Sequence, residues 1–60
     1  MNLNHMELQS LRHLIGSHMT MEKKMNFYAE EAQDPQCRQM FAQSAKSAGQ
    51  TAQKLRAFLG

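Results

Sequence analysis

His18 is the residue in this 60-residue chain whose type and position best suit metal chemistry. It falls in the middle of a stripe of apolar residues, where the core of a helical bundle would hold a metal ligand. One hypothesis is a histidine ligand in a central site, paired with the same histidine of a second copy. The other is a neutral core histidine that hydrogen-bonds to Thr51 or to a helix carbonyl.

The remaining ligands of a carboxylate-bridged di-iron site are missing from the sequence. Such a site needs inward-facing glutamates and Glu-x-x-His motifs. No glutamate is followed by histidine three residues later, and residues 35–60 contain neither acid nor histidine. His18, Met19 and Met21 would suit a soft metal, but they point in different directions on a helix, and methionine is more often a packing residue. We therefore predict no enzyme activity, no cofactor and no metal centre, with His18 as the one candidate ligand.

Cys37 is the only cysteine, so an intrachain disulfide is excluded. It falls in the first turn of a predicted helix, where backbone amides can lower a thiol pKa and favour redox chemistry or a disulfide between copies. It also lies on the predicted seam between helices, where cysteine is ordinarily a small buried hydrophobe. No base accompanies it in the sequence, so nucleophilic catalysis is not predicted.

Charge is divided unevenly along the chain, whose net charge is +2. Residues 1–34 carry three basic and five acidic groups, whereas residues 35–60 carry four basic groups and no acid. A basic helix can bind nucleic acid, but these charges are scattered and no docking motif accompanies them, so we predict no nucleic-acid partner. The glutamines at 36, 39, 43, 50 and 53 suit a surface that contacts other proteins or copies, and a plain polar surface is the alternative.

A helix over about residues 5–32 is the first element that the sequence predicts. The stripe at 11, 14, 18, 21, 25, 28 and 32 has the alternating spacing of three and four that marks one helix face. Asn4 and Glu7 are placed to form a capping box at its start.

Asp34-Pro35 marks the start of a second helix, because an N-cap residue is followed by proline at the first helical position. We expect a turn over 33–35 and a helix over about 35–59, with Gly60 as its C-cap. Its stripe runs through 37, 41, 44, 48, 51, 55 and 58. So short a turn makes the helices antiparallel; Tyr28 then faces Phe41, Leu14 faces Leu55, and Leu11 faces Phe58.

A single hairpin of this size has difficulty stabilising itself, and disulfides or metal are not available to it. Apolar residues beside the two stripes, such as Ile15 and Ala45, also need a second surface to cover them. We therefore predict an all-α antiparallel hairpin that dimerises into a four-helix bundle. The predicted core and dimer interface consists of Leu8, Leu11, Leu14, Ile15, His18, Met21, Met25, Tyr28, Met40, Phe41, Ala45, Ala48, Ala52, Leu55, Phe58 and Leu59.

The chain shows no targeting or membrane signal. No apolar run approaches the length of a membrane span, and Met1–His5 lacks the basic region and apolar core of a signal peptide. We therefore expect no membrane partner.

Several segments resemble the ferritin-like spore coat proteins of endospore-forming bacteria, the short relatives of spore coat protein F. The most specific is the run Tyr-Ala-x-x-Ala-x-Asp-Pro-Gln at 28–36, and the likeness extends from about His5 to Leu59. The other matching segments are Leu14-Ile15-Gly16-Ser17-His18, Lys24, Phe41 and Gln53–Leu59.

The resemblance implies a ferritin-like bundle built from two hairpins. It also implies a place in the cytoplasm of the sporulating cell and then in the spore coat. Family members often have glutamate where this chain has His18, and histidines where it has Ala48 and Thr51, so a metal site of the family is expected to be lost here. The sequence thus predicts a non-enzymatic structural protein that self-associates and contacts other coat proteins. The alternative is a degenerate ferritin-like protein that binds metal through His18.

Overall fold

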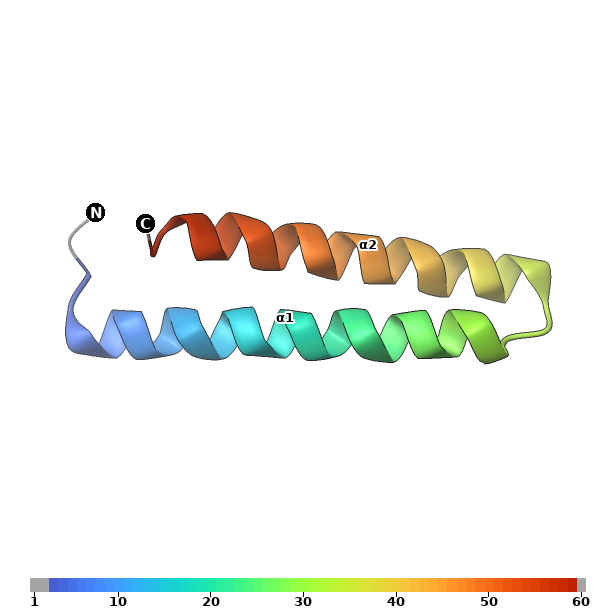
Figure 1. Cartoon of the computed structure of the whole chain (residues 1–60), viewed down its shortest axis with the longest axis horizontal. Coiled ribbons are helices and arrows are strands. Elements are labelled where there is room, and N and C mark those ends of the chain that lie inside the picture. Colours follow the sequence, from blue (N-terminus) through green and yellow to red (C-terminus); the bar gives the residue numbers. More distant parts are fainter. Residues whose placement is uncertain (1–2, 60) are drawn as a thin grey trace.

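Two long α-helices make up the part of the chain that the structure describes, residues 3–59 of a computed structural model. Helix α1 (His5–Glu31) and helix α2 (Pro35–Ala57) are joined by the turn at 32–34. They run antiparallel, with the turn at one end and the start of α1 beside the end of α2 at the other (Figure 1). The predicted all-α antiparallel hairpin is therefore confirmed.

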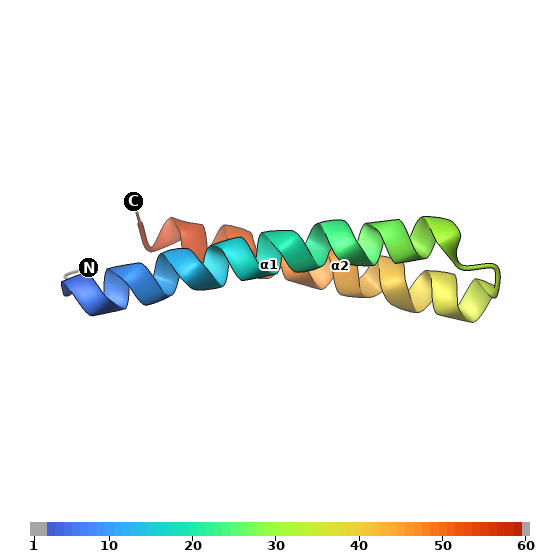
Figure 2. The same cartoon turned by 90° about the horizontal axis from the view of Figure 1, so that it is seen from below.

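The hairpin is narrow for its length, with extents of 46 × 14 × 12 Å over the Cα atoms. Seen from below, the two helices cross at a shallow angle and stay in contact along their length (Figure 2). Neither helix has a stretch long and apolar enough to cross a membrane within the described residues.

The start of α1 is closed by the predicted capping box. The Asn4 side chain accepts a hydrogen bond of 2.7 Å from the Glu7 amide, and the Asn4 amide donates one of 3.0 Å to the Glu7 carboxylate. These two bonds satisfy amide groups that have no partner inside the helix. At the other end, the Ala32 amide donates to the Tyr28 carbonyl and closes the last turn.

The start of α2 follows from Asp34 and Pro35. The Asp34 carboxylate accepts a hydrogen bond of 2.9 Å from the Cys37 amide, while Pro35 occupies the first turn, where its missing N–H costs no bond. The helix ends at Ala57, and the next two residues form a tighter turn in which the Phe58 amide donates to the Leu55 carbonyl. The expected cap at Gly60 lies outside the described residues.

The seam between the helices differs from the predicted one by one row of residues. Ile15, Ala45, Ala48 and Ala52 are the buried residues of the described chain. On α1 the seam follows Leu8, Leu11, Ile15, His18, Glu22, Met25 and Ala29 and continues to Ala32 in the turn, all of them buried or half-buried. The expectation that Ile15 and Ala45 face away from the partner helix is therefore wrong, and Leu14 and Met21 are exposed instead.

The composition of α2 explains this choice of seam. On α2, positions 41, 48 and 55 belong to both the predicted and the observed seam. Ala45 and Ala52 lie on one side of this row, and Ser44 and Thr51 lie on the other. Burying alanine lets the helix axes approach closely. Burying the hydroxyl side chains would remove them from water without an assured hydrogen-bond partner. The alanine row therefore faces α1 and draws Ile15 into the seam.

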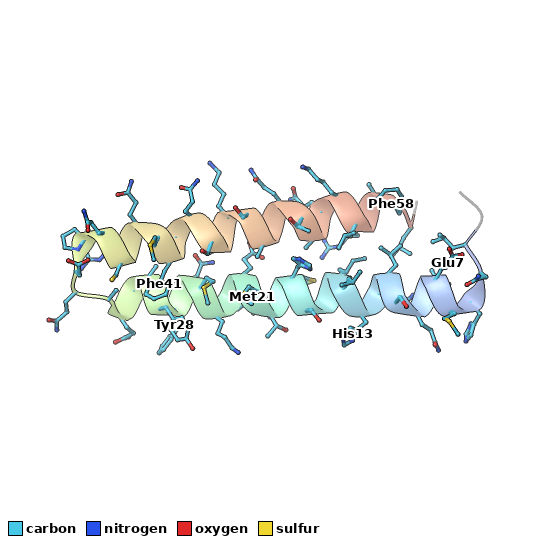
Figure 3. The ribbon with its side chains drawn as sticks, turned by 180° about the vertical axis from the view of Figure 1, so that it is seen from behind. Glu7, His13, Met21, Tyr28, Phe41 and Phe58 are labelled. Carbon is cyan, nitrogen blue, oxygen red and sulfur yellow. The ribbon has the colours of Figure 1, made fainter. Side chains whose placement is uncertain are left out.

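The predicted pairing of residues along the hairpin is confirmed at its turn end. The Tyr28 and Phe41 rings lie 5.4 Å apart between centroids and are tilted by 58°, which is a favourable geometry for aromatic rings. Figure 3 shows these two rings next to one another, with Met21 at mid-length and Phe58 at the open end. Leu11, Leu14, Leu55 and Phe58 line one groove near the open end.

Candidate interaction surface

One long side of the hairpin exposes large apolar side chains from both helices. Leu14, Met21 and Tyr28 are seven residues apart on α1, which places them on one side of the helix. Each is between 40 and 47% exposed, and Phe58 from α2 is 48% exposed. The lateral apolar face, as we call it, consists of these four residues and the half-buried Leu11, Phe41 and Leu55 beside them.

The lateral apolar face has an apolar cluster towards each end. At the open end a shallow groove is lined mainly by aliphatic and aromatic side chains, namely Leu3, Met6, Leu11, Leu14, Leu55 and Phe58. At the turn end Tyr28 and Phe41 line a second shallow depression. Phe27 extends this cluster outward, because its ring lies 6.2 Å from that of Tyr28.

The middle of the same face carries smaller side chains on α2. Here α1 contributes Met21, while α2 contributes Ser44 and Thr51, which are seven residues apart and share the side of the helix that carries Phe58. A surface with bulky ends and small hydroxyl side chains between them can lie flush against another helix pair.

The opposite side of the hairpin is polar. Arg56 donates a hydrogen bond of 3.0 Å from Nη2 to the sulfur of Met19, and the Glu22 side chain lies over Gly49. Lys46, Gln50 and Gln53 complete the groove on this side. The two sides therefore differ in chemistry: Leu14, Met21, Tyr28 and Phe58 lie on one of them, and Met19 is the large apolar residue that lines the groove on the other.

His18 is half-buried on the seam, as a core histidine would be. Its Nδ1 lies 2.8 Å from the Leu14 carbonyl oxygen. Because a carbonyl oxygen accepts and cannot donate, Nδ1 is the donor of this hydrogen bond. This geometry matches the hypothesis of a core histidine bonded to a helix carbonyl. Within residues 3–59 no three His, Cys, Asp or Glu side chains are grouped closely enough to hold a metal ion.

Cys37 is exposed and does not lie on the seam, which corrects its predicted placement. A hydrogen bond to the Asp34 carboxylate, and that group's repulsion of a thiolate, raise the pKa of the Cys37 thiol. Backbone amides at the start of a helix can lower a thiol pKa, but the pKa of Cys37 is raised because of the Asp34 carboxylate.

Arg38 has a role that the sequence analysis missed. Its Nε and Nη2 atoms both donate to the Ala32 carbonyl oxygen, at 3.2 and 3.0 Å, and so connect the first turn of α2 to the end of α1. The last turn of α1 contains no basic residue of its own, so Arg38 also supplies the positive charge that favours a helix C-terminus. The sequence feature that could have indicated this role is an arginine placed within one helical turn of a short loop.

The residues predicted for the core and dimer interface separate into three groups. The buried group is Ile15, Ala45, Ala48 and Ala52. The half-buried group is Leu8, Leu11, His18, Met25, Phe41 and Leu55. The exposed group is Leu14, Met21, Tyr28, Met40, Phe58 and Leu59. The first two groups hold the hairpin together, and the third supplies most of the apolar surface that has no partner within the chain.

The fold defines an α-helical hairpin with one apolar side. Comparison of the chain with models of known protein families, with curated proteins and with solved structures gives no match. The resemblance to ferritin-like spore coat proteins therefore rests on the sequence alone, above all on residues 28–36.

Proposed function

We propose that this chain is a structural protein that works by self-association, with two hairpins pairing through their lateral apolar faces into a four-helix bundle. One observation carries the proposal: Leu14, Met21, Tyr28 and Phe58 are exposed along one side, while three of the four residues buried within 3–59 are alanines. A chain of this size buries too little apolar surface to be comfortably stable by itself. A second copy supplies the missing cover.

The dimensions of the hairpin suit this arrangement. A side of 46 by 14 Å, roughened by its side chains, approaches the area of about 800 Å² that each partner contributes to a typical stable interface. Apolar groups buried there contribute about 25 cal/mol for each Å² removed from water. Because the dimer is two-fold symmetric, each exposed residue of the lateral apolar face is buried in both copies. Its effect on assembly is therefore doubled.

Sedimentation velocity tests self-association directly. The 6.9 kDa chain is expected to sediment as a dimer with twice that mass, and a folded monomer at high protein concentration would overturn the proposal. Met21→Gln places an amide in the lateral apolar face and is expected to dissociate the dimer. Met19→Gln is the matched control, because it makes the same change on the polar side and should leave the dimer intact.

The proposal extends to a place in the bacterial spore coat, and the support for this part is the resemblance of residues 28–36 and the segments around them. The outer side of α2 also suits contacts with neighbouring coat proteins, because Gln36, Gln43 and Gln50 form an exposed row with seven-residue spacing. An antibody raised against the chain should label the surface layers of intact spores and detect the chain in coat extracts. Its absence from both would overturn this assignment.

Metal binding at His18 is the competing function, and one observation favours it. Metal-bound histidines commonly donate their other ring N–H to a carbonyl, which is the arrangement of His18 and Leu14. Elemental analysis of protein purified without chelator separates the two functions. Stoichiometric iron, zinc or copper that is lost in His18→Ala would overturn the purely structural role, and a metal content near zero would exclude the metal site.

A further inference from the structure

The two ends of the hairpin carry opposite charge. At the turn end, Glu30, Glu31 and Asp34 outnumber the two cations Lys24 and Arg38. At the open end three cations, Arg12, Lys54 and Arg56, outnumber the single carboxylate of Glu7. The charged groups at these ends are exposed, and a length of 46 Å separates the ends of the molecule by several Debye lengths at physiological salt. The hairpin is therefore electrically polar along its long axis.

The lateral apolar face, in contrast, has nearly the same pattern from either end. Leu14 and Tyr28 lie seven residues on either side of Met21, and Leu55 and Phe41 lie seven residues on either side of Ala48. A second hairpin can therefore cover this face in either orientation with its apolar clusters aligned. The apolar pattern brings the copies together without deciding which way round they lie.

We infer that the two hairpins of the dimer lie antiparallel, related by a two-fold axis that runs perpendicular to their length and passes beside Met21 and Ala48. This inference rests on the self-association proposed above. Each acidic turn end then lies against the basic open end of the other copy. The opposite arrangement, with both turns at the same end of the bundle, would bring like charges together at both ends.

The middle of the lateral apolar face, where α2 carries Ser44 and Thr51, favours the same orientation. With the axis beside Ala48, Ser44 of one copy lies opposite Thr51 of the other, because these residues are four and three positions away from Ala48. Their hydroxyl groups can then hydrogen-bond to one another across the interface. In the parallel arrangement α1 stacks on α2 of the other copy, which places Met21 over these hydroxyls and leaves them without polar partners.

The charges at the two ends determine the orientation of the hairpins in the dimer more than they determine its affinity. Exposed ion pairs contribute little to binding and are screened by salt, whereas unfavourable juxtapositions discriminate between alternative arrangements. Apolar contact between the Leu14 and Leu55 cluster of one copy and the Tyr28 and Phe41 cluster of the other supplies the affinity.

Distances between spin labels distinguish the two orientations. The variants are Gln36→Cys and Gln50→Cys, each in a Cys37→Ser background, because both glutamines are exposed on the outer side of α2 and away from the lateral apolar face. Gln36 is twelve residues from Ala48 along the helix. At 1.5 Å per residue, an antiparallel dimer separates the two labels at residue 36 by about 36 Å or more. A parallel dimer places the two α2 helices on the diagonal of the bundle at the same height, so labels at residue 36 and labels at residue 50 give nearly the same distance across the bundle.

Labels at residue 50 provide the comparison, because this position is two residues from the axis, and in the antiparallel dimer its two copies lie close together on adjacent helices. A long distance at 36 with a short distance at 50 supports the antiparallel dimer. Nearly equal distances at the two positions overturn the orientation and leave self-association standing. The absence of dipolar coupling at both positions, together with a monomeric mass, overturns self-association itself.

Discussion

The carboxylate of Glu22 lies against Gly49 across the seam, in the space where a β-carbon on residue 49 would stand. Glu22 occupies a half-buried position of α1 between the seam residues His18 and Met25. The missing side chain at Gly49 lets the carboxylate pass over α2 towards the polar side of the hairpin, where Lys46 and Arg56 lie. Glycine at this position therefore accommodates a charged residue on an otherwise apolar seam.

This relationship predicts different effects for two glycine substitutions. Replacing a helical glycine by alanine stabilises a helix by up to about 1 kcal/mol. Gly16→Ala should show this gain, because a β-carbon there meets no other atom within 4 Å. Gly49→Ala should gain less or nothing, since Glu22 must move aside. Urea unfolding of both variants at one protein concentration measures the difference. An equal gain would contradict the placement of Glu22.

The seam predicts a cost for shortening Ile15, the one large side chain buried within the chain among residues 3–59. Ile15→Val removes one methylene group from this site and should lower the free energy of unfolding by about 1 kcal/mol. Phe27→Leu is the control, because Phe27 is 57% exposed on the outer side of α1. Thermal unfolding followed by circular dichroism compares the two, and a larger loss for Phe27→Leu would contradict the observed seam.

The contact of Arg38 with the end of α1 predicts that stability depends on the shape of its guanidinium group as well as on its charge. Arg38→Ala should lower the free energy of unfolding by about 1 kcal/mol, because the Ala32 carbonyl loses two donors and the helix end loses a cation. Arg38→Lys keeps the cation without the two-pronged donor and should lose an intermediate amount. Lys46→Ala, on the exposed surface of α2, is the control and should change stability little.

Asp34 predicts the reactivity of Cys37. Its carboxylate raises the pKa of the thiol above the usual 9.0, so the thiolate fraction is small at neutral pH and alkylation by iodoacetamide should be slow. Asp34→Asn keeps an N-cap side chain while removing the negative charge. This variant should react faster at pH 8, and its pH–rate curve should shift to lower pH. An unchanged curve would show that Asp34 does not act on the thiol.

The same interaction gives a sign for the effect of pH on stability. The folded state holds the thiol proton of Cys37 more tightly than the unfolded state does. The contribution of this interaction to the free energy of unfolding is therefore fully present below pH 9.0. It falls as the pH rises from 9.0 through the higher pKa of the folded state. Asp34→Asn should reduce this fall, and Cys37→Ser, which removes the thiol, should abolish it. Urea unfolding at a series of pH values between 7 and 11 measures both effects.

Much of the fold follows from short stretches of sequence. The capping box of Asn4 and Glu7 and the Asp34-Pro35 boundary are local signals, because capping depends on residues within one helical turn. The short turn then determines the antiparallel arrangement and brings Tyr28 to Phe41. For the same reason these features could be predicted without knowledge of the packing.

The choice of seam was decided only by the tertiary structure. Helix α1 has two adjacent apolar rows, one containing Ile15 and the other Leu14 and Met21, and its own periodicity favours neither. Docking against α2 selects the first, because the alanines at 45 and 52 pack closely, whereas Ser44 is left exposed and Thr51 is only half-buried. The contact of Glu22 with Gly49 and the exposure of the lateral apolar face follow from that selection. The sequence by itself determined the helices, their caps and their direction, whereas the packing of one helix on the other determined which apolar side remains free for a partner.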